Sequence, residues 1–212
     1  MTETVESKLR RVAVVPLLKA DHPDTAVRTV QALSAGGLDV VEVVLRTPAA
    51  LECLAAIRRE LPGVLVGAGT VLNAGQVPAV VDAGASFIVS PGLDEGLVEA
   101  GIAAGLPVYP GTATATEVQR AFNLGLRTIK FFPAGIAGGP KLLQALGEVF
   151  PGISFFATGG ISPDNLAQYL SLPTVIACGG SWLAPADAIA SGEFDRVIRL
   201  AMEAVMLAAT IE

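Results

Sequence analysis

The sequence contains few charged residues, few aromatic residues, and almost no cysteine or histidine. Charged residues make up 16% of the 212 positions and aromatic residues 5%, with two cysteines and one histidine. A single histidine and the isolated Cys53 and Cys178 provide no cluster with metal-ligand spacing, so neither a metal site nor a disulfide framework is predicted. Two lone cysteines are instead typical of buried thiols in a reducing cytoplasm.

Basic residues are too few and too scattered for nucleic-acid binding. The chain has 14 Lys and Arg against 20 Asp and Glu, for a net charge of −6, and no stripe of cations could neutralise a phosphate backbone. Long apolar runs are also missing. The apolar segment at 83–93 is short and contains Pro91 and Gly92, so no membrane span or targeting segment is predicted. A small anion still fits, since one or two cations and backbone amides can bind it.

Apolar residues, by contrast, are abundant. Hydrophobic residues account for 52% of the chain and the mean hydropathy is +0.60, which is ample for a large core and suggests buried subunit contacts. Short apolar runs alternate with amphipathic stretches, and Gly36, Gly84, Gly105 and Gly125 mark helix ends where a left-handed cap would fit. The eight runs lie at 12–18, 39–46, 64–71, 87–92, 107–111, 128–134, 154–160 and 175–182.

This alternation predicts βα units and a parallel sheet. Eight strands and eight helices in 212 residues fit an α/β fold of the TIM type, one (β/α)8 barrel domain over 1–212, and an open doubly wound sheet is the alternative. The segment 3–10 is expected to form an extra helix that closes the barrel bottom. Such barrels carry their catalytic residues at the C-terminal strand ends. Several runs here end in polar or turn-forming residues, which places a site at that end.

The sixth run contains one lysine in otherwise apolar surroundings. Alternate side chains of a strand share a face, so Lys130 and Phe132 point one way while Ile129 and Phe131 point the other. With the latter two packed outward against helices, Lys130 points into the barrel. Burial disfavours the charged form of a lysine, so a free amine that could form a Schiff base is expected. A structural cation paired with a glutamate, or a phosphate ligand, is the alternative.

The second run, DVVEVVLR, sends a carboxylate and a guanidinium to one face. Glu42 and Arg46 lie four positions apart, an even number, so both enter the barrel interior. Glu42 could move protons as a general acid and base, directly or through a water. Arg46 could hold a substrate carboxylate with its two-pronged donor set. The alternative is an internal salt network of these two residues with Lys130 and no chemistry.

Two glycine pairs add a possible phosphate site. TGG at 158–160 and CGGS at 178–181 end the seventh and eighth runs, where barrel loops and a following short helix often cradle phosphate. Glycine permits close backbone approach, and exposed N–H groups at a helix start favour an anion. The alternative is that the turns alone require these glycines.

Together these residues resemble the class I 2-keto-3-deoxy-6-phosphogluconate (KDPG) aldolases, which overlap in activity with 4-hydroxy-2-oxoglutarate (KHG) aldolases. The resemblance runs from about Val12 to the last helix. It implies a TIM barrel, a cytoplasmic homotrimer, no cofactor, and reversible cleavage of KDPG to pyruvate and D-glyceraldehyde 3-phosphate. It is carried by VEVVLRT (41–47), VGAGTVLN (66–73), SPGL (90–93), YPGTATATE (109–117), KFFPA (130–134), TGGI (158–161) and GGSWL (179–183).

The resemblance also assigns roles to single residues. It implies that Lys130 is the Schiff-base lysine and that Glu42 is the acid and base, working through a bound water. Arg46 and Thr70 would receive the pyruvate carboxylate. Judged from the residues alone, a threonine at position 70 or 158 is equally well explained as a β-branched packing residue.

The remaining assignments concern the pocket wall and the phosphate. The pocket around the ketimine would be shaped by Pro91, Phe132 and Thr158, and the phosphate would lie against Gly159, Gly160, Gly179, Gly180 and Ser181. Two positions depart from the family pattern: Ala157 stands where proline usually precedes TGG, and Lys19 stands where some members carry an arginine.

Two rival functions fit the same barrel. One is a phosphosugar isomerase or synthase in which Lys130 merely pairs with an anion, and the other is a non-catalytic phosphosugar-binding barrel. Within the aldolase reading, KDPG, its galactonate-derived C4 epimer and KHG, which would yield pyruvate and glyoxylate, are all candidate substrates.

Overall fold

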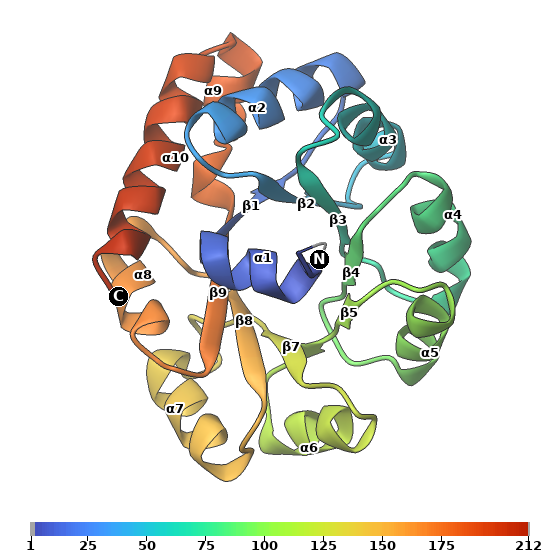
Figure 1. Cartoon of the computed structure of the whole chain (residues 1–212), viewed down its shortest axis with the longest axis vertical. Coiled ribbons are helices and arrows are strands. Elements are labelled where there is room, and N and C mark those ends of the chain that lie inside the picture. Colours follow the sequence, from blue (N-terminus) through green and yellow to red (C-terminus); the bar gives the residue numbers. More distant parts are fainter. Residues whose placement is uncertain (1–2, 212) are drawn as a thin grey trace.

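The strands form a closed barrel. The computed structural model describes residues 3–211, and its nine parallel strands follow the order β5-β4-β3-β2-β1-β9-β8-β7-β6. The two end strands, β5 and β6, are consecutive in the chain and flank Pro110, so the chain itself joins the two ends of the sheet. In Figure 1 the helices other than α1 form a ring around the strands, and α1 lies across the middle of the view. This arrangement confirms the predicted barrel and excludes the open sheet.

Each of the eight apolar runs contains a strand, but most strands end before their run does. β4, for example, ends at Val89, because Ser90 begins a turn in which its hydroxyl donates to the carbonyl of Gly92 over 2.7 Å. The fifth run is divided in two, since Pro110 has no N–H for the ladder. The strands are β1 Val14–Leu18, β2 Val40–Val44, β3 Leu65–Gly69, β4 Phe87–Val89, β5 Val108–Tyr109, β6 Gly111–Thr112, β7 Thr128–Phe131, β8 Ser154–Thr158 and β9 Val175–Gly180.

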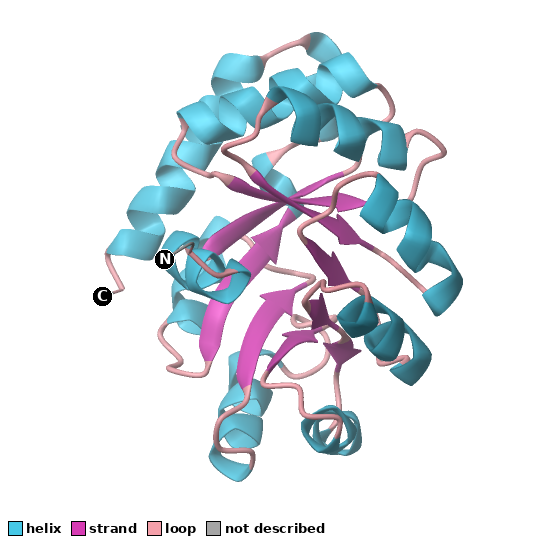
Figure 2. Ribbon diagram, turned by 45° about the vertical axis from the view of Figure 1, so that its right-hand side comes forward, coloured by secondary structure: helices cyan, strands magenta, loops and turns pink. Residues whose placement is uncertain are grey.

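The helices cover the outside of the barrel (Figure 2). They are α1 Val5–Val12, α2 Pro23–Ala35, α3 Ala50–Glu60, α4 Val77–Asp82, α5 Glu95–Ala103, α6 Ala115–Asn123, α7 Gly139–Val149, α8 Pro163–Leu170, α9 Ala186–Ser191 and α10 Phe194–Ala209, with short 3-10 turns η1 Ala74–Gln76 and η2 Ser181–Leu183. Across residues 3–211, no helix combines the length and the apolar character that crossing a bilayer requires.

The strands are apolar on both faces because both faces are covered. Inward-facing side chains such as Phe87 and Phe156 fill the barrel interior on the side of α1, in one cluster with Leu9. Outward-facing side chains, among them Ile129 and Phe131, pack beneath the surrounding helices in two further clusters. The alternation predicted for the sixth run is therefore present in β7, and it leaves Lys130 on the inner face.

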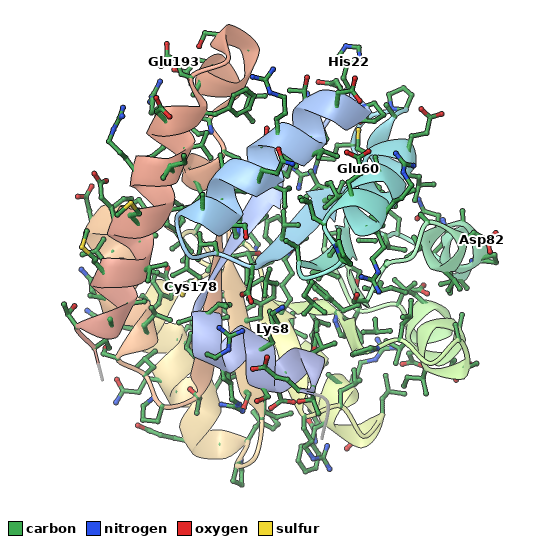
Figure 3. The ribbon with its side chains drawn as sticks, turned by 45° about the horizontal axis from the view of Figure 1, so that its top comes forward. Lys8, His22, Glu60, Asp82, Cys178 and Glu193 are labelled. Atoms are coloured by element: carbon green, nitrogen blue, oxygen red, sulfur yellow. The ribbon has the colours of Figure 1, made fainter. Side chains whose placement is uncertain are left out.

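Helix α1 closes the N-terminal end of the barrel, as expected for the opening segment. Its Leu9 is fully buried among the inward-facing side chains. The helix is fastened by Lys8, whose Nζ lies 3.2 Å from a carboxylate oxygen of Asp39 (Figure 3), and by Arg10, which donates to Ser154 Oγ over 2.8 Å. The barrel interior is thereby sealed at this end.

Three of the four predicted glycine caps adopt the left-handed conformation. Gly84, Gly105 and Gly125 have positive φ angles, but Gly36 does not, so that prediction is wrong. The left-handed residue after α2 is Gly37, with φ 99°. Gly36 is needed for space instead, since a Cβ there would lie 2.4 Å from the Cβ of Ala201 on α10.

Candidate active site

A cavity of about 310 Å³ opens at the C-terminal ends of the strands. It lies where sequence reasoning placed the site, at the end of the barrel opposite α1. Nine predicted site residues line it: Arg46, Lys130, Phe132, Thr158, Gly159, Gly160, Gly179, Gly180 and Ser181.

Lys130, which lines this cavity, forms a buried ion pair with Glu42, which is not among the lining residues. Lys130 lies on β7 with 5% of its side chain exposed, and Glu42 lies on β2 with 0% exposed. Their Nζ and Oε1 atoms are 3.7 Å apart. Removing two charges from water is costly, and each is tolerated because the other lies beside it. The pair can therefore exchange a proton without creating an isolated buried charge.

Gly69 on β3 makes the space for the Glu42 carboxylate, and Gly67 makes the space for the ring of Phe87. A Cβ on Gly69 would lie 2.0 Å from Glu42 Oε1, and a Cβ on Gly67 would lie 2.1 Å from the ring of Phe87. Among the described residues, neither carboxylate oxygen accepts a hydrogen bond. The carboxylate is thus free to act as an acceptor for a proton from Lys130, from a water or from a ligand.

Arg46 follows β2 and projects into the cavity. Its Nε donates to Thr70 Oγ1 over 3.2 Å, and within residues 3–211 its terminal amino groups make no hydrogen bond. Two parallel N–H groups remain available, which is the donor arrangement that matches a carboxylate. The two residues predicted to receive the carboxylate, Arg46 and Thr70, thus lie in direct contact.

Phe132 and Thr158 border the lysine. The Phe132 ring centroid lies 5.1 Å from Lys130 Nζ, close enough for the ring face to attract a positive charge. Thr158, at the end of β8, is fully buried, and its hydroxyl has no partner among the described residues. That hydroxyl therefore lacks the hydrogen bond that a packing residue with a satisfied hydroxyl would have.

The glycine pairs form the upper wall of the cavity. Gly159 and Gly160 have φ angles of 90° and 82°, in the left-handed region that favours glycine. Gly180 has no room for a side chain, because a Cβ would overlap the ring of Trp182 at 1.5 Å. η2 begins directly after this glycine, at Ser181. The result is a bare backbone surface with a hydroxyl at its edge, suited to an anion.

The structure does not bring all the predicted residues to this wall. Pro91 lines a separate depression beside β4, together with Leu72 and Asp94. Three apolar wall residues, Leu17, Val44 and Ile161, were missed. Strand alternation could have identified Val44, because it lies between Glu42 and Arg46 on the same face.

A second cavity of about 330 Å³ lies at the opposite end of the barrel beside Arg10 and Arg11. The guanidinium groups there are engaged by nearby carboxylates, such as Glu6 at 3.0 Å from Arg10. Among its described lining residues there is no lysine, cysteine, serine or carboxylate. This cavity therefore offers no amine or thiol among its described residues that could form a covalent bond with a substrate.

The two cysteines are not competing nucleophiles. Burial raises the pKa of the Cys53 thiol to about 11, with the carboxylates of Asp21 and Glu52 adding to the effect. Burial also raises the pKa of Cys178. Both thiols stay protonated near neutral pH, and a protonated thiol is a poor nucleophile.

Comparison with known proteins identifies the group to which this site belongs. The family model of KDPG and KHG aldolases matches residues 5–200. The chain is a member of this aldolase family. The resemblance drawn from the motifs is thereby confirmed, and the barrel is an aldolase barrel.

Individual relatives of this aldolase match it along most of their length. A 2-dehydro-3-deoxy-phosphogluconate aldolase of Pseudoalteromonas atlantica is 48% identical and covers 93% of this chain and 92% of its own. A KHG/KDPG aldolase of Escherichia coli is 46% identical over 95% of each chain. The crystal structure of a KDPG aldolase from Legionella pneumophila, with pyruvate captured as a covalent carbinolamine, is 39% identical with a TM-score of 0.90, over 93% of this chain and 96% of that one.

Proposed function

We propose that this aldolase cleaves KDPG reversibly into pyruvate and D-glyceraldehyde 3-phosphate through a Schiff base on Lys130. The observation that carries the proposal is the buried Lys130–Glu42 pair, 3.7 Å apart, whose lysine lines an open cavity. The covalent pyruvate carbinolamine in the Legionella relative supports a lysine mechanism, because a carbinolamine is the first product of an amine and a keto group.

The first stage forms the imine. Lys130 Nζ passes a proton to the Glu42 carboxylate, and its lone pair attacks the C2 carbonyl carbon of the substrate. The resulting carbinolamine loses its hydroxyl as water, with the proton supplied by Glu42, and leaves a cationic imine. Arg46 and Thr70 hold the neighbouring carboxylate, which fixes C2 above the nitrogen.

The second stage breaks the C3–C4 bond. Glu42, acting through a bound water, takes the proton of the C4 hydroxyl, and the electrons of the C3–C4 bond move into the imine to give an enamine. The aldehyde leaves. Glu42 then returns the proton to C3, and water hydrolyses the imine to release pyruvate and the free amine of Lys130.

The charges around the cavity favour a substrate with two anionic ends. Three cations, Lys19, Arg46 and Lys130, line the cavity, against the single carboxylate of Glu42 below it. Arg46 would bind the carboxylate end. The phosphate end would lie against the glycine surface that ends at Ser181, within reach of Lys19. This arrangement suits KDPG, and its C4 epimer differs in one hydroxyl and fits the same ends. KHG, which lacks the phosphate, would use the carboxylate end alone.

We further propose that the chain assembles as a homotrimer in the cytoplasm. Large apolar side chains on the surface, such as Leu72 at 57% and Ile136 at 89% exposed, support burial against other copies. Two free, buried cysteines suit a reducing compartment. Light scattering of the purified protein is expected to give three times the chain mass of 21.6 kDa.

Borohydride trapping tests the proposed chemistry. The protein is incubated with pyruvate, reduced with borohydride, digested and analysed by mass spectrometry, in parallel with a Lys130→Ala variant. We expect a pyruvyl mass gain on the peptide that contains Lys130 and none in the variant. A gain that persists in the variant, or never appears in the parent, would refute the mechanism. If that result came with continued turnover of a phosphosugar, the protein would be a phosphosugar isomerase or synthase. If there were no turnover, it would be a non-catalytic phosphosugar-binding barrel.

A further inference from the structure

Thr70 has an unusual backbone conformation for its residue type. Within residues 3–211, Thr70 and Ala13 are the two non-glycine residues with positive φ, at 60° and 55°. This region of backbone space is uncommon for any residue with a Cβ, and a β-branched residue such as threonine is an outlier there. Such a conformation persists only where the surrounding structure enforces it.

The left-handed conformation of Thr70 reverses the alternation of inward-facing and outward-facing side chains along β3. In β3, Val66 and Ala68 face outward into the cluster beneath the helices, and Gly69 faces inward against Glu42. Continued alternation would send Thr70 outward and Val71 inward. The structure shows the reverse for Val71, which is fully buried in the outer cluster.

The Thr70 hydroxyl is thereby brought to the mouth of the barrel. It accepts a hydrogen bond from Arg46 Nε at 3.2 Å, and Arg46 lines the cavity. An extended Thr70 would project this hydroxyl from the opposite face of the strand. The contact between Arg46 and Thr70 therefore depends on the left-handed turn.

Neighbouring strands hold this turn from both sides. The carbonyl of Gly69 accepts a hydrogen bond from the amide of Leu45 at 2.8 Å, and the amide of Val71 donates to the carbonyl of Val89 at 3.2 Å. The residues before and after Thr70 are thus each bonded to a different strand, which leaves the single residue between them to absorb the change of face.

We propose that Thr70 is a positioning residue whose strained backbone sets the orientation of the Arg46 carboxylate clamp, at the expense of fold stability. Glycine would adopt this turn without strain, but it has no hydroxyl to orient the guanidinium. The inference rests on the proposed function, because it assumes that Arg46 receives the carboxylate of a keto acid. It adds that the backbone conformation at position 70, as well as the hydroxyl, determines how well that carboxylate is bound.

Four variants separate the hydroxyl from the backbone. Thr70→Ser keeps the hydroxyl, Thr70→Ala removes it and keeps a Cβ in the strained conformation, and Thr70→Gly removes both. Ala13→Gly is the matched control, because it relieves the same kind of strain at the opposite end of the barrel, away from the cavity. For each protein the melting temperature is measured, together with the pyruvate concentration that gives half-maximal borohydride trapping.

Stability and binding are expected to move in opposite directions at position 70. The Thr70→Gly variant should melt about 2–4 °C above the Thr70→Ala variant, and Ala13→Gly should raise the melting temperature of the parent with unchanged trapping. The pyruvate concentration for half-maximal trapping should rise about 10-fold in Thr70→Ala, because a hydrogen bond to a charged group is lost. In the more stable Thr70→Gly it should rise at least about 3-fold further, because a more flexible backbone holds Arg46 less well in position. Thr70→Ser should stay within about 3-fold of the parent.

Two results would overturn the inference. If Thr70→Gly is no more stable than Thr70→Ala, the turn stores no strain. If both variants need the same pyruvate concentration, the backbone conformation does not position the clamp. Neither result affects the Schiff base, whereas absence of trapping on Lys130 in the parent protein would instead refute the proposed function.

Discussion

Replacing Gly69 by alanine should disable the proposed acid and base without touching it chemically. The new Cβ would lie 2.0 Å from Glu42 Oε1 and 2.6 Å from its Cγ and Cδ. Ordinary contacts begin at 3.4 Å, so the carboxylate must move by about 1.4 Å, the difference between the two values. Strand β3 is bonded on both sides, and the side chain of Glu42 therefore has to give way rather than the backbone.

A displacement of this size has a large effect on a proton transfer. A misplacement of about 1 Å commonly lowers a rate about 100-fold, which corresponds to about 2.7 kcal/mol at about 1.36 kcal/mol per factor of ten. Crowding a packed interior should also lower stability by about 1–3 kcal/mol. In a chain of this length that is a fall in melting temperature of about 2–12 °C.

The assay follows pyruvate released from KDPG, with borohydride trapping measured in parallel. We expect kcat of Gly69→Ala to fall about 100-fold, and the rate at which saturating pyruvate is trapped on Lys130 to fall with it, because Glu42 also serves imine formation. Gly63→Ala is the control, since a Cβ at Gly63 meets nothing within 4 Å, and it should leave kcat unchanged. A Gly69→Ala enzyme with kcat within threefold of the parent would refute the argument that Gly69 shapes the place of Glu42.

Three further predictions follow from the site and from one helix end. Glu42→Gln should lower kcat about 100- to 10,000-fold, and it should also slow the trapping of pyruvate on Lys130, because both proton transfers of imine formation use the same carboxylate. Lys19→Gln should raise KM for KDPG about 2- to 5-fold, as expected for a solvent-exposed charge contact. Because KHG lacks the phosphate, its KM should stay nearly unchanged in the same assay of released pyruvate. Backbone N–H groups, chiefly that of Ala113, hold the pKa of Glu117 below its ordinary value of 4.5, so its contribution to stability is complete above pH 4.5 and is lost as pH falls through the lowered value. The gap in melting temperature between the parent and Glu117→Gln should therefore shrink in acid.

Strand periodicity explains why much of the site could be anticipated. Lys130, Glu42 and Arg46 were placed inside the barrel by counting alternate residues, and β2 and β7 are regular enough for that count to hold. The barrel followed from eight apolar runs separated by helical stretches. Neither inference required knowledge of which strands are neighbours.

Other features depend on information that a local pattern does not contain. The turn at Thr70 reverses the alternation, and nothing in the letters GAGT indicates that their threonine, directly after the strand, will be left-handed. The space for Glu42 requires the pairing of β2 with β3, because Gly69 of β3 accommodates the side chain of Glu42 on β2. Gly36 and Gly37 are adjacent glycines, and packing against α10 decides which of them bends the chain.

Because α1 closes the N-terminal end of the barrel, substrate and products share one opening. Leu9 blocks the closed end and Lys130 lies deep in the open cavity, so every molecule enters and leaves through the C-terminal end of the barrel. In cleavage, the aldehyde fragment stands between the lysine-bound pyruvate and the exit, so it must depart before pyruvate can be released. In synthesis, pyruvate must load first. We therefore expect strictly ordered product release, in which pyruvate is a competitive inhibitor with respect to KDPG.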